Sequence, residues 1–270
     1  MKPSFIIIGG VKCASSSLYR YLNEHPQVLP CKTKEPQFFN SRNPLKLLKG
    51  YRNYLDLFPK KSQNEVIADW LEIGDDLKME KSQFTKEISD DINYITGEAT
   101  ASLFVTANPR LIKLFFPKIK IILLLRDPAE RYISHFKMFK RLENEGFENF
   151  KGMGEIEDFV HKEITDLNNG KPTKILHQGL YINYLPKWNK VFKNNLKIIY
   201  TKDLNNANTS QKLNEITDYL GLEKYDFSYA SSKKHNVSPT DERNEKIERK
   251  LDNFYAPFNA KLSKEFNLVF

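Results

Sequence analysis

Residues 5–22 read Phe-Ile-Ile-Ile-Gly-Gly-Val-Lys-Cys-Ala-Ser-Ser-Ser-Leu-Tyr-Arg-Tyr-Leu, and they carry a strong indication of the fold class. The β-branched run Phe5–Ile8 predicts a strand buried on both faces, as in a parallel sheet. Gly9-Gly10 ends that strand. Ser15–Ser17 then offer hydroxyls to cap a helix, which we expect to end at His25-Pro26. The stretch therefore predicts the strand–turn–helix start of an α/β protein.

The same alternation continues along the chain. We expect further strands at Val66–Trp70, Tyr94–Thr96, Ile119–Leu125 and Leu196–Tyr200. Helices are expected at Leu48–Phe58, Pro109–Phe116, Ala129–Leu142, Tyr181–Phe192 and Leu213–Leu220, with Pro186 implying a kink or a late start in the fourth. Strands separated by helices imply right-handed crossovers. The predicted fold class is a single α/β domain over residues 1–270, with a central parallel β-sheet flanked by helices.

The charge balance is basic. The 270 residues include 42 Lys and Arg against 34 Asp and Glu, a formal net charge of +8. This balance favours an anionic ligand, whether a nucleotide, an acidic or sulfated sugar, a nucleic acid or an anionic membrane surface. The basic residues are spread through the chain, with no block of five that would indicate a nucleic-acid arm. We therefore expect no nucleic-acid partner.

Cysteines and apolar runs exclude other classes. Cys13 and Cys31 are the only cysteines, and neither belongs to a metal-binding or redox pair. We therefore expect neither a disulfide scaffold nor a metal site. The longest apolar runs are far too short to span a bilayer. Met1 is followed almost at once by the first strand, which leaves no room for a signal peptide, so the expected localisation is cytoplasmic.

The first candidate site is the turn at residues 9–17. A glycine turn from a strand into a helix directs backbone N–H groups and the helix dipole at one point, a geometry that binds phosphate. Lys12 adds a mobile positive charge, and Ser15–Ser17 add hydroxyl donors. The nucleotide P-loop pattern GxxxxGK[ST] is absent. A plain turn with a solvated Lys12 and a serine cap is the alternative.

The second candidate site follows the strand at Ile119–Leu125. Arg126 stands at its carboxyl end, where open α/β sheets bind ligands. Ser134 lies about two turns into the next helix and could face the same side. The guanidinium fork matches the oxygens of a phosphate. In the alternative interpretation Arg126 pairs with Asp127 or Glu130 as a structural cap.

The third candidate site is Lys34-Glu35-Pro36-Gln37-Phe38-Phe39. Glu35 stands between a lysine and an aromatic pair, in a loop after the phosphate turn. A carboxylate there could act as a general base. The alternative is a solvated Lys-Glu pair on the surface.

In order and spacing these segments resemble the family of sulfotransferases that use 3′-phosphoadenosine 5′-phosphosulfate (PAPS). The similarity is greatest to the heparan-sulfate and related carbohydrate branch and to bacterial relatives. Residues 10–18 resemble the family's 5′-phosphosulfate loop, residues 34–39 its KE-x-H-F-F segment, and residues 125–135 its 3′-phosphate segment L-R-D-P-x-E-R-x-x-S-H. Gly97–Thr100, Gly179–Tyr181 and Phe254–Asn259 resemble three shorter motifs of the family.

The sequence departs from the family pattern at four positions. Ala14 replaces the usual Gly, where its methyl group could crowd the phosphate, and Ser15 replaces Thr. Gln37 replaces His, and Ala99 replaces a Lys of the heparan enzymes. The late disulfide of the Golgi members has no counterpart, in keeping with a reducing compartment.

The resemblance implies a P-loop-like nucleotide-binding fold and transfer of a sulfuryl group from PAPS to a hydroxyl or amine of a carbohydrate or small molecule. It implies Glu35 as the base and Lys12 as the cation on the leaving phosphate. The residues implied in binding PAPS are Lys12, Cys13, Ala14, Ser15, Ser16, Ser17, Arg126 and Ser134. Lys233, Lys234 and His235 would close over the donor or, alternatively, form an exposed basic loop.

Two other function classes stay open at this point. A nucleotide-dependent kinase would share the phosphate turn, but the Walker lysine position and an acidic Mg²⁺-binding strand end are missing. A non-catalytic basic module that binds glycans or nucleic acid would explain the charge without catalysis. Residues 60–92 are charged and weakly periodic, and we expect them to line the acceptor side of the site as an insertion.

Overall fold

The computed structural model of the chain describes residues 1–60, 62–73, 79–204, 209–227 and 244–270. They form two compact units. The first comprises Met1–Gly9, Cys13–Leu125 and Lys187–Val237, and the second comprises Gly10–Lys12, Arg126–Pro186 and Ser238–Phe270. The extent of the sulfotransferase-like domain stays a prediction.

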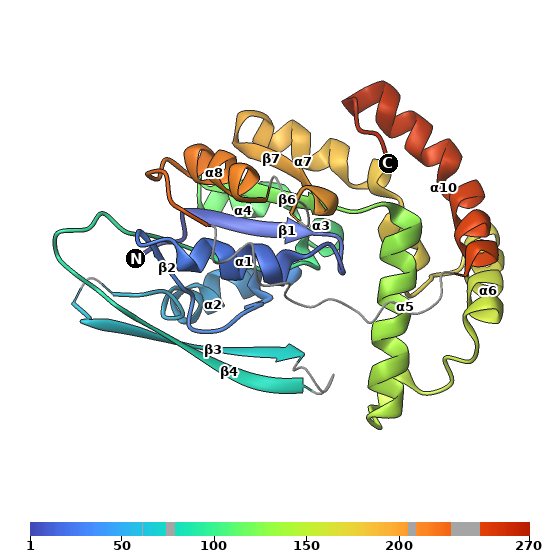
Figure 1. Cartoon of the computed structure of the whole chain (residues 1–270), viewed down its shortest axis with the longest axis horizontal. Coiled ribbons are helices and arrows are strands. Elements are labelled where there is room, and N and C mark those ends of the chain that lie inside the picture. Colours follow the sequence, from blue (N-terminus) through green and yellow to red (C-terminus); the bar gives the residue numbers. More distant parts are fainter. Residues whose placement is uncertain (61, 74–78, 205–208, 228–243) are drawn as a thin grey trace. The chain divides into compact units, whose positions relative to one another are not determined.

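The core of the first unit is a parallel sheet. Within the described residues it has five strands in the order β2-β5-β1-β6-β7 (Figure 1). The strands are β1 (Phe5–Gly9), β2 (Val28–Leu29), β5 (Ile95–Ala99), β6 (Lys120–Leu125) and β7 (Leu196–Tyr200). Every residue of β1 is buried, as is β6 from Ile121 on. The predicted parallel sheet is confirmed.

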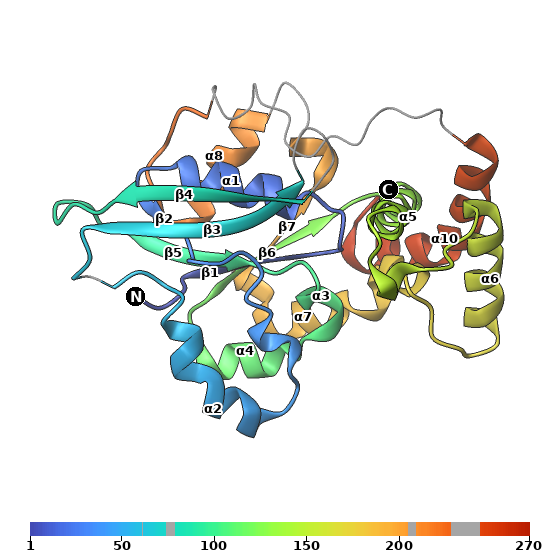
Figure 2. The same cartoon turned by 90° about the horizontal axis from the view of Figure 1, so that it is seen from below.

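Helices cover both faces of this sheet. Helices α1 (Ser15–Glu24) and α8 (Thr209–Leu220) lie on one face, and α2 (Pro44–Leu55) and α4 (Pro109–Phe115) lie on the other (Figure 2). The short helix α3 (Leu103–Thr106) precedes α4. Helix α7 (Leu185–Phe192) begins one residue before Pro186, so the proline marks a late start and no kink.

The strand order identifies the edge of the sheet that binds ligands in proteins of this class. β1 is central, and the chain runs from it by way of α1 to β2 on one side. From β6, on the other side of β1, the chain runs to β7. Open α/β sheets bind ligands at the carboxyl ends of the strands where the order reverses. Those ends are Gly9 of β1 and Leu125 of β6, and a predicted phosphate segment follows each.

Helix α2 differs from the predicted Leu48–Phe58 in its bounds. The structure buries Leu47 and Tyr54, whereas Leu48 is exposed, and the helix ends at Leu55, before Phe58. Leu48, the predicted start of the helix, thus points outward, whereas Phe58, its predicted end, is buried beyond the last turn. The reason is tertiary, because the Tyr54 hydroxyl reaches a buried carboxylate of β5, as described below.

Strands β3 (Glu65–Ile73) and β4 (Met79–Glu87) pair antiparallel (Figure 1), and we call these two strands the hairpin. The predicted strand at Val66–Trp70 is confirmed, and β4 was missed. Val66, Ala68 and Trp70 point inward and are buried. The Trp70 ring stacks on Phe84, with centroids 5.6 Å apart.

A partly buried lysine ties β4 to the end of α1 and the start of β2. Lys86 Nζ donates hydrogen bonds to the backbone oxygens of Asn23, His25 and Val28, at 3.1, 2.5 and 2.8 Å. Burial lowers the pKa of Lys86 to about 8. Its three acceptors lie at the end of α1 and the start of β2, so β4 is fixed by a charged side chain.

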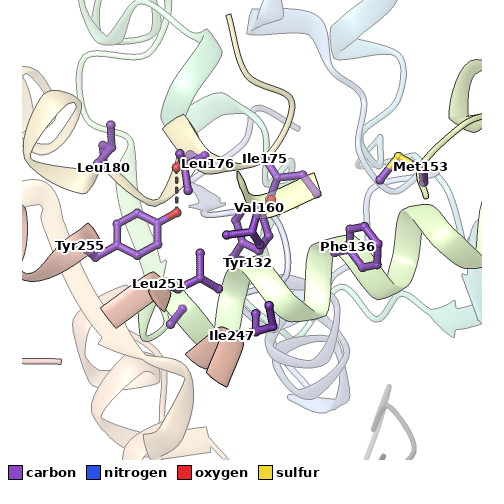
Figure 3. Close-up of a cluster of buried hydrophobic side chains, with 11 residues drawn as sticks. Tyr132, Phe136, Met153, Val160, Ile175, Leu176, Leu180, Ile247, Leu251 and Tyr255 are labelled. Atoms are coloured by element: carbon purple, nitrogen blue, oxygen red, sulfur yellow. Dashed lines mark hydrogen bonds between the residues drawn. The ribbon is translucent and has the colours of Figure 1, made fainter. Parts of the chain in front are cut away.

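The second unit is helical, with its own apolar core. Helices α5 (Pro128–Asn144), α6 (Ile156–Asn168) and α10 (Glu245–Phe266) contribute to a buried cluster (Figure 3). The Tyr255 hydroxyl of α10 donates to the backbone oxygen of Leu176 at 2.8 Å (Figure 3). A Cβ at Gly179 would lie 2.7 Å from that hydroxyl. The two short motifs at 179–181 and 254–259 thus pack against each other.

Candidate active site

The chain between β1 and α1 forms a tight loop with unusual backbone angles. Lys12 and Ala14 have φ of 72° and 64°. Ala14 is the N-cap of α1 and makes no side-chain hydrogen bond, so the predicted serine cap is wrong. The first N–H groups of a helix lack intrahelical acceptors, and the first turn of α1 carries no acidic residue. This helix start is therefore suited to an anionic ligand.

The backbone explains why related loops carry Gly where this chain has Ala14. A left-handed φ costs an L-amino acid about 1–2 kcal/mol, and glycine avoids that cost. Ala14 keeps the loop conformation at this energetic cost. The departure from the motif therefore leaves the turn itself intact.

A second lysine reaches the start of α1. Lys34 Nζ donates to Ser16 Oγ at 2.5 Å. Burial lowers the pKa of Lys34, and the charge of Glu35 opposes that effect. The structure thus brings the Lys34-Glu35 segment to the first turn of α1. The sequence singled out Glu35 and gave no role to Lys34, although both stand in the same motif.

A buried carboxylate lies near Glu35. Glu98 of β5 is 1% exposed, and its two oxygens accept hydrogen bonds from the hydroxyls of Tyr54 (2.6 Å) and Thr100. Burial raises the pKa of Glu98 to about 7, the two hydroxyls lower it, and the negative charge of Glu35 adds to the increase. Glu35 itself is only half-buried and has φ of 56°. Of the two carboxylates, Glu35 is the more accessible.

The glycine of the 97–100 motif has a packing role. A Cβ at Gly97 would lie 2.6 Å from the backbone oxygen of Phe5 in β1. The Gly97 oxygen accepts a hydrogen bond from the Tyr19 hydroxyl, which in turn accepts one from the Cys31 N–H. Gly97 thus allows β5 to pair closely with β1, and the register places Glu98 opposite Ile6 of that strand.

In the second unit, Arg126 is held by its own helix. Arg126 Nε lies 3.1 Å from Glu130 Oε2, and the Arg126 backbone oxygen accepts from the Tyr181 hydroxyl at 2.8 Å. Asp127 is the N-cap of α5 and accepts from the N–H groups of Ala129 and Glu130. The pairing that the alternative interpretation required is present. It is a half-exposed pair, of a kind that contributes little to stability.

Ser134 is half-buried on α5, next to a polar cluster. The neighbouring His135 is buried, and its Nδ1 lies 3.3 Å from Arg131 Nη1. Because an arginine can only donate, His135 Nδ1 accepts. Burial lowers the pKa of His135 to about 3, and the charges of Arg131 and Lys12 contribute. Lys12 therefore lies within electrostatic reach of α5, and His135 is a weak base.

Of the remaining predicted site residues, three are buried and three lie outside the described part of the chain. The Cys13, Ser15 and Ser17 side chains are buried, so a ligand would meet the backbone of Cys13 and not its thiol. Lys233, Lys234 and His235 lie outside the described residues. Among the residues that the structure describes, no group of three or more His, Cys, Asp or Glu side chains could hold a metal ion. No described helix combines the length and the apolar character needed to cross a bilayer.

Comparison with known proteins gives consistent matches. The model of the sulfotransferase family matches residues 3–226. Human carbohydrate sulfotransferase 15 is 27% identical over 97% of this chain and 53% of its own length. The mouse bifunctional heparan sulfate N-deacetylase/N-sulfotransferase 4 is 26% identical over 84% of this chain and 23% of its own. The chain thus spans about half the length, or less, of these relatives.

Two solved structures share the fold. A sulfotransferase from Alicyclobacillus acidocaldarius aligns with a TM-score of 0.67 and 19% identity, covering 100% of this chain and 98% of its own. A mouse sulfotransferase solved in complex with PAP aligns with a TM-score of 0.55 and 11% identity, covering 98% and 86%. These likenesses confirm the predicted fold class.

Proposed function

We propose that this chain, which belongs to the sulfotransferase family, moves a sulfuryl group from PAPS to an acceptor hydroxyl or amine. One observation carries the proposal beyond family membership. The uncapped start of α1 follows the central strand β1, and Lys34 adds a cation to its first turn. A helix start of this kind binds phosphate or phosphosulfate oxygens without further groups.

In this proposal each predicted phosphate segment holds one end of PAPS. The backbone of Cys13–Ser17 binds the 5′-phosphosulfate, with Lys12 and Lys34 as its cations. Arg126 and Ser134 bind the 3′-phosphate. Arg126 then exchanges its half-exposed pairing with Glu130 for a phosphate, whose charge and geometry suit the guanidinium better.

The reaction is an in-line displacement at sulfur. The acceptor oxygen or nitrogen attacks the sulfur while the bond from sulfur to the 5′-phosphate oxygen breaks, so negative charge develops on the leaving phosphate. Lys12 neutralises that charge, as fixed cations do in phosphoryl transfer. The proton of the acceptor passes to Glu35.

Accessibility supports Glu35 as the base. Glu98 is buried, and both its oxygens accept hydrogen bonds, so an acceptor cannot reach it without breaking the Tyr54 and Thr100 contacts. His135 is held neutral and is a poor base. Glu98 instead fixes the end of β5 beside Glu35.

The acceptor in this proposal is a carbohydrate. The support is that the relatives are named for carbohydrate and heparan sulfate sulfotransfer. The hairpin of β3 and β4 is proposed to line the acceptor side, because the Asp69 N–H donates to the Lys32 oxygen, two residues before Lys34. The cytoplasmic localisation stays a prediction.

The test begins with ligand binding. Thermal shift with PAP, ATP plus Mg²⁺, heparin and DNA should show stabilisation by PAP in proportion to its concentration over its dissociation constant. Stabilisation by ATP plus Mg²⁺ instead would favour the alternative function of a nucleotide-dependent kinase. Stabilisation by heparin or DNA alone would favour a non-catalytic module.

Transfer from labelled PAPS to a panel of desulfated glycans and small hydroxyl compounds then tests catalysis. Glu35→Gln should keep PAP affinity and lose about a hundredfold or more in kcat. Lys12→Ala should lower kcat more than it lowers PAP affinity. Full activity of Glu35→Gln at neutral pH would show that the base is another residue.

A further inference from the structure

The first unit has one face that is basic without any acidic residue. Residues 36–55, 99–119 and 187–196 contain none of the 34 Asp and Glu of the chain. Their basic residues are Arg42, Lys46, Lys49, Arg52, Arg110, Lys113, Lys118, Lys187, Lys190 and Lys193. These ten exceed the formal charge of +8 of the whole chain, so the remaining residues sum to −2. The basic character of the chain is therefore local.

The three segments meet on the sheet face opposite α1 and α8. Helices α2 and α4 lie side by side there, with the rings of Tyr51 and Phe115 5.1 Å apart (Figure 2). Lys113 of α4 lies over the ring of Phe192, at the end of α7, 5.5 Å from its centroid. We call the exposed surface of these three segments the α2–α4–α7 face.

Three large apolar side chains project from this face. Leu45 and Leu48 of α2 are 68% and 62% exposed, and Leu114 of α4 is 72% exposed. Lys46 and Lys49 are exposed next to the two α2 leucines. Exposed leucines surrounded by lysines are typical of helices that lie in a membrane interface.

The positive charges on this face are close enough to act on one another. Burial lowers the pKa of Lys187, and the positive charge of Arg42 lowers it further. In the part of the chain that the structure describes, Lys46, Lys49 and Arg52 form no ion pair, and α2 has no acidic residue to supply one. An anionic partner would relieve this mutual repulsion.

We infer that the α2–α4–α7 face docks on an anionic lipid surface. Leu45, Leu48 and Leu114 enter the boundary between headgroups and acyl chains, and the surrounding Lys and Arg contact lipid phosphates. A sulfated glycan or a nucleic acid would satisfy the charges, but neither offers a place for three exposed leucines. The inference concerns a surface outside the residues assigned to PAPS and does not depend on the proposed reaction.

Vesicle sedimentation tests the inference. At about 0.1 M salt the full chain should bind vesicles of 70% phosphatidylcholine and 30% phosphatidylglycerol, and it should not bind pure phosphatidylcholine. Each cation near such a surface strengthens binding about fivefold. Lys46→Glu with Lys49→Glu changes four unit charges and should therefore weaken binding by about 600-fold. Leu45→Ser with Leu48→Ser should weaken it about tenfold, with little dependence on salt.

Matched controls carry the same changes elsewhere. Lys250→Glu with Lys261→Glu on α10 and Val269→Ser alter exposed residues of the second unit, and they should bind as the unchanged chain does. Circular dichroism and thermal melting establish that each variant is folded. Should the charge reversal impair folding, Lys46→Gln with Lys49→Gln takes its place and should weaken binding about 25-fold.

Three outcomes would overturn the inference. The first is no binding to anionic vesicles by the folded chain. The second is binding that the α2 variants and the α10 controls reduce equally. The third is binding to heparin that Lys46→Glu with Lys49→Glu abolishes while vesicles are ignored, which would make the face a site for acidic glycans.

Discussion

Helices α1 and α5 both follow a central strand of the sheet, yet they begin in opposite ways. The N-cap of α1 is Ala14, which makes no side-chain hydrogen bond, and the first turn has no acidic residue. The N-cap of α5 is Asp127, whose carboxylate accepts two backbone N–H groups, and Glu130 stands in the first turn. The backbone donors of α1 can serve a ligand, whereas those of α5 already serve its own cap.

Under the proposed function, this difference implies two modes of anion binding. At α1 the protein would bind a phosphate through the helix backbone, assisted by Lys12 and Lys34. At α5 it would bind through side chains, because the helix start is occupied. Arg126 is the side chain placed to do so, once it leaves Glu130. Variants at Arg126, Ala14 and Asp127 test this division.

Arg126→Ala should weaken PAP binding by about 2–5 kcal/mol, the range for removing one partner of a buried charge pair. Calorimetry with PAP measures the effect. Glu130→Gln is the matched control, since it frees Arg126 from its intrahelical partner and should leave PAP affinity equal or higher. Equal losses in the two variants would mean that the ion pair acts only by holding α5 together.

Glu98, near the end of β5, should make the stability of the protein depend on pH. Its folded-state pKa of about 7 lies above the ordinary 4.5, so the folded state binds a proton more tightly than the unfolded state. The resulting stability is complete below pH 4.5 and is lost as the pH rises through 7, by about 3 kcal/mol in total. Glu98→Gln should remove this pH dependence from urea unfolding curves.

A second variant checks that the dependence belongs to Glu98. The Tyr54 hydroxyl lowers the pKa of Glu98, so Tyr54→Phe should move the midpoint of the loss to higher pH. If neither variant changes how the free energy of unfolding varies between pH 4.5 and 7, the pH dependence belongs to another group.

Ala14→Asp should convert the start of α1 into one that resembles α5. The new carboxylate would sit where the ligand anion is proposed to bind, and PAP affinity should fall by about 2 kcal/mol, or roughly thirtyfold. Ala14→Asn, which has the same shape without the charge, should lose much less. Calorimetry at two salt concentrations separates the two, because only the charged variant should recover at high salt. Equal losses would indicate crowding of the loop.

Comparing these sites with the sequence shows which features are local. The loop at 9–17 and the segment at 125–134 were predicted because a strand end, glycines and basic or hydroxyl side chains are adjacent in the chain. The sequence did not show, however, that the N-caps of α1 and α5 differ. The three serines after Ala14 predicted a serine N-cap. The residue type alanine gives no sign that Ala14 adopts a left-handed φ and is itself the N-cap.

The features that were missed depend on contacts distant in sequence. Lys34 meets Ser16 from 18 positions away, and Tyr54 meets Glu98 from 44. Strand β4 was missed because most of its residues are polar or charged, which leaves Phe84 as the main apolar signal. Its Lys86 instead binds three backbone carbonyls at the end of α1 and the start of β2. The fold class follows from local patterns, and the supporting network of the site does not.

Asp127→Ala tests the cap of α5 directly. Loss of the two hydrogen bonds to Ala129 and Glu130 should lower the free energy of unfolding by about 1 kcal/mol. PAP affinity should change little, because the backbone donors of α5 are not proposed to meet the ligand. A gain in PAP affinity would show that Asp127 competes with the ligand, and the division between the two helices would fail. Chemical denaturation and calorimetry on the same preparation give both values.

The smallest effect is expected for Ala14→Gly. Glycine adopts the φ of 64° without the steric cost that alanine bears, but it loses more backbone entropy on folding. The net result should be a gain of about 0.5–1 kcal/mol in the free energy of unfolding, with PAP affinity changed less than threefold. Ala129→Gly, in the first turn of α5, is the matched control and should instead destabilise the protein by about 1 kcal/mol. Destabilisation by both variants would mean that the α1 loop is not strained at Ala14, and that the glycine of related loops serves the approach of the ligand and not the backbone.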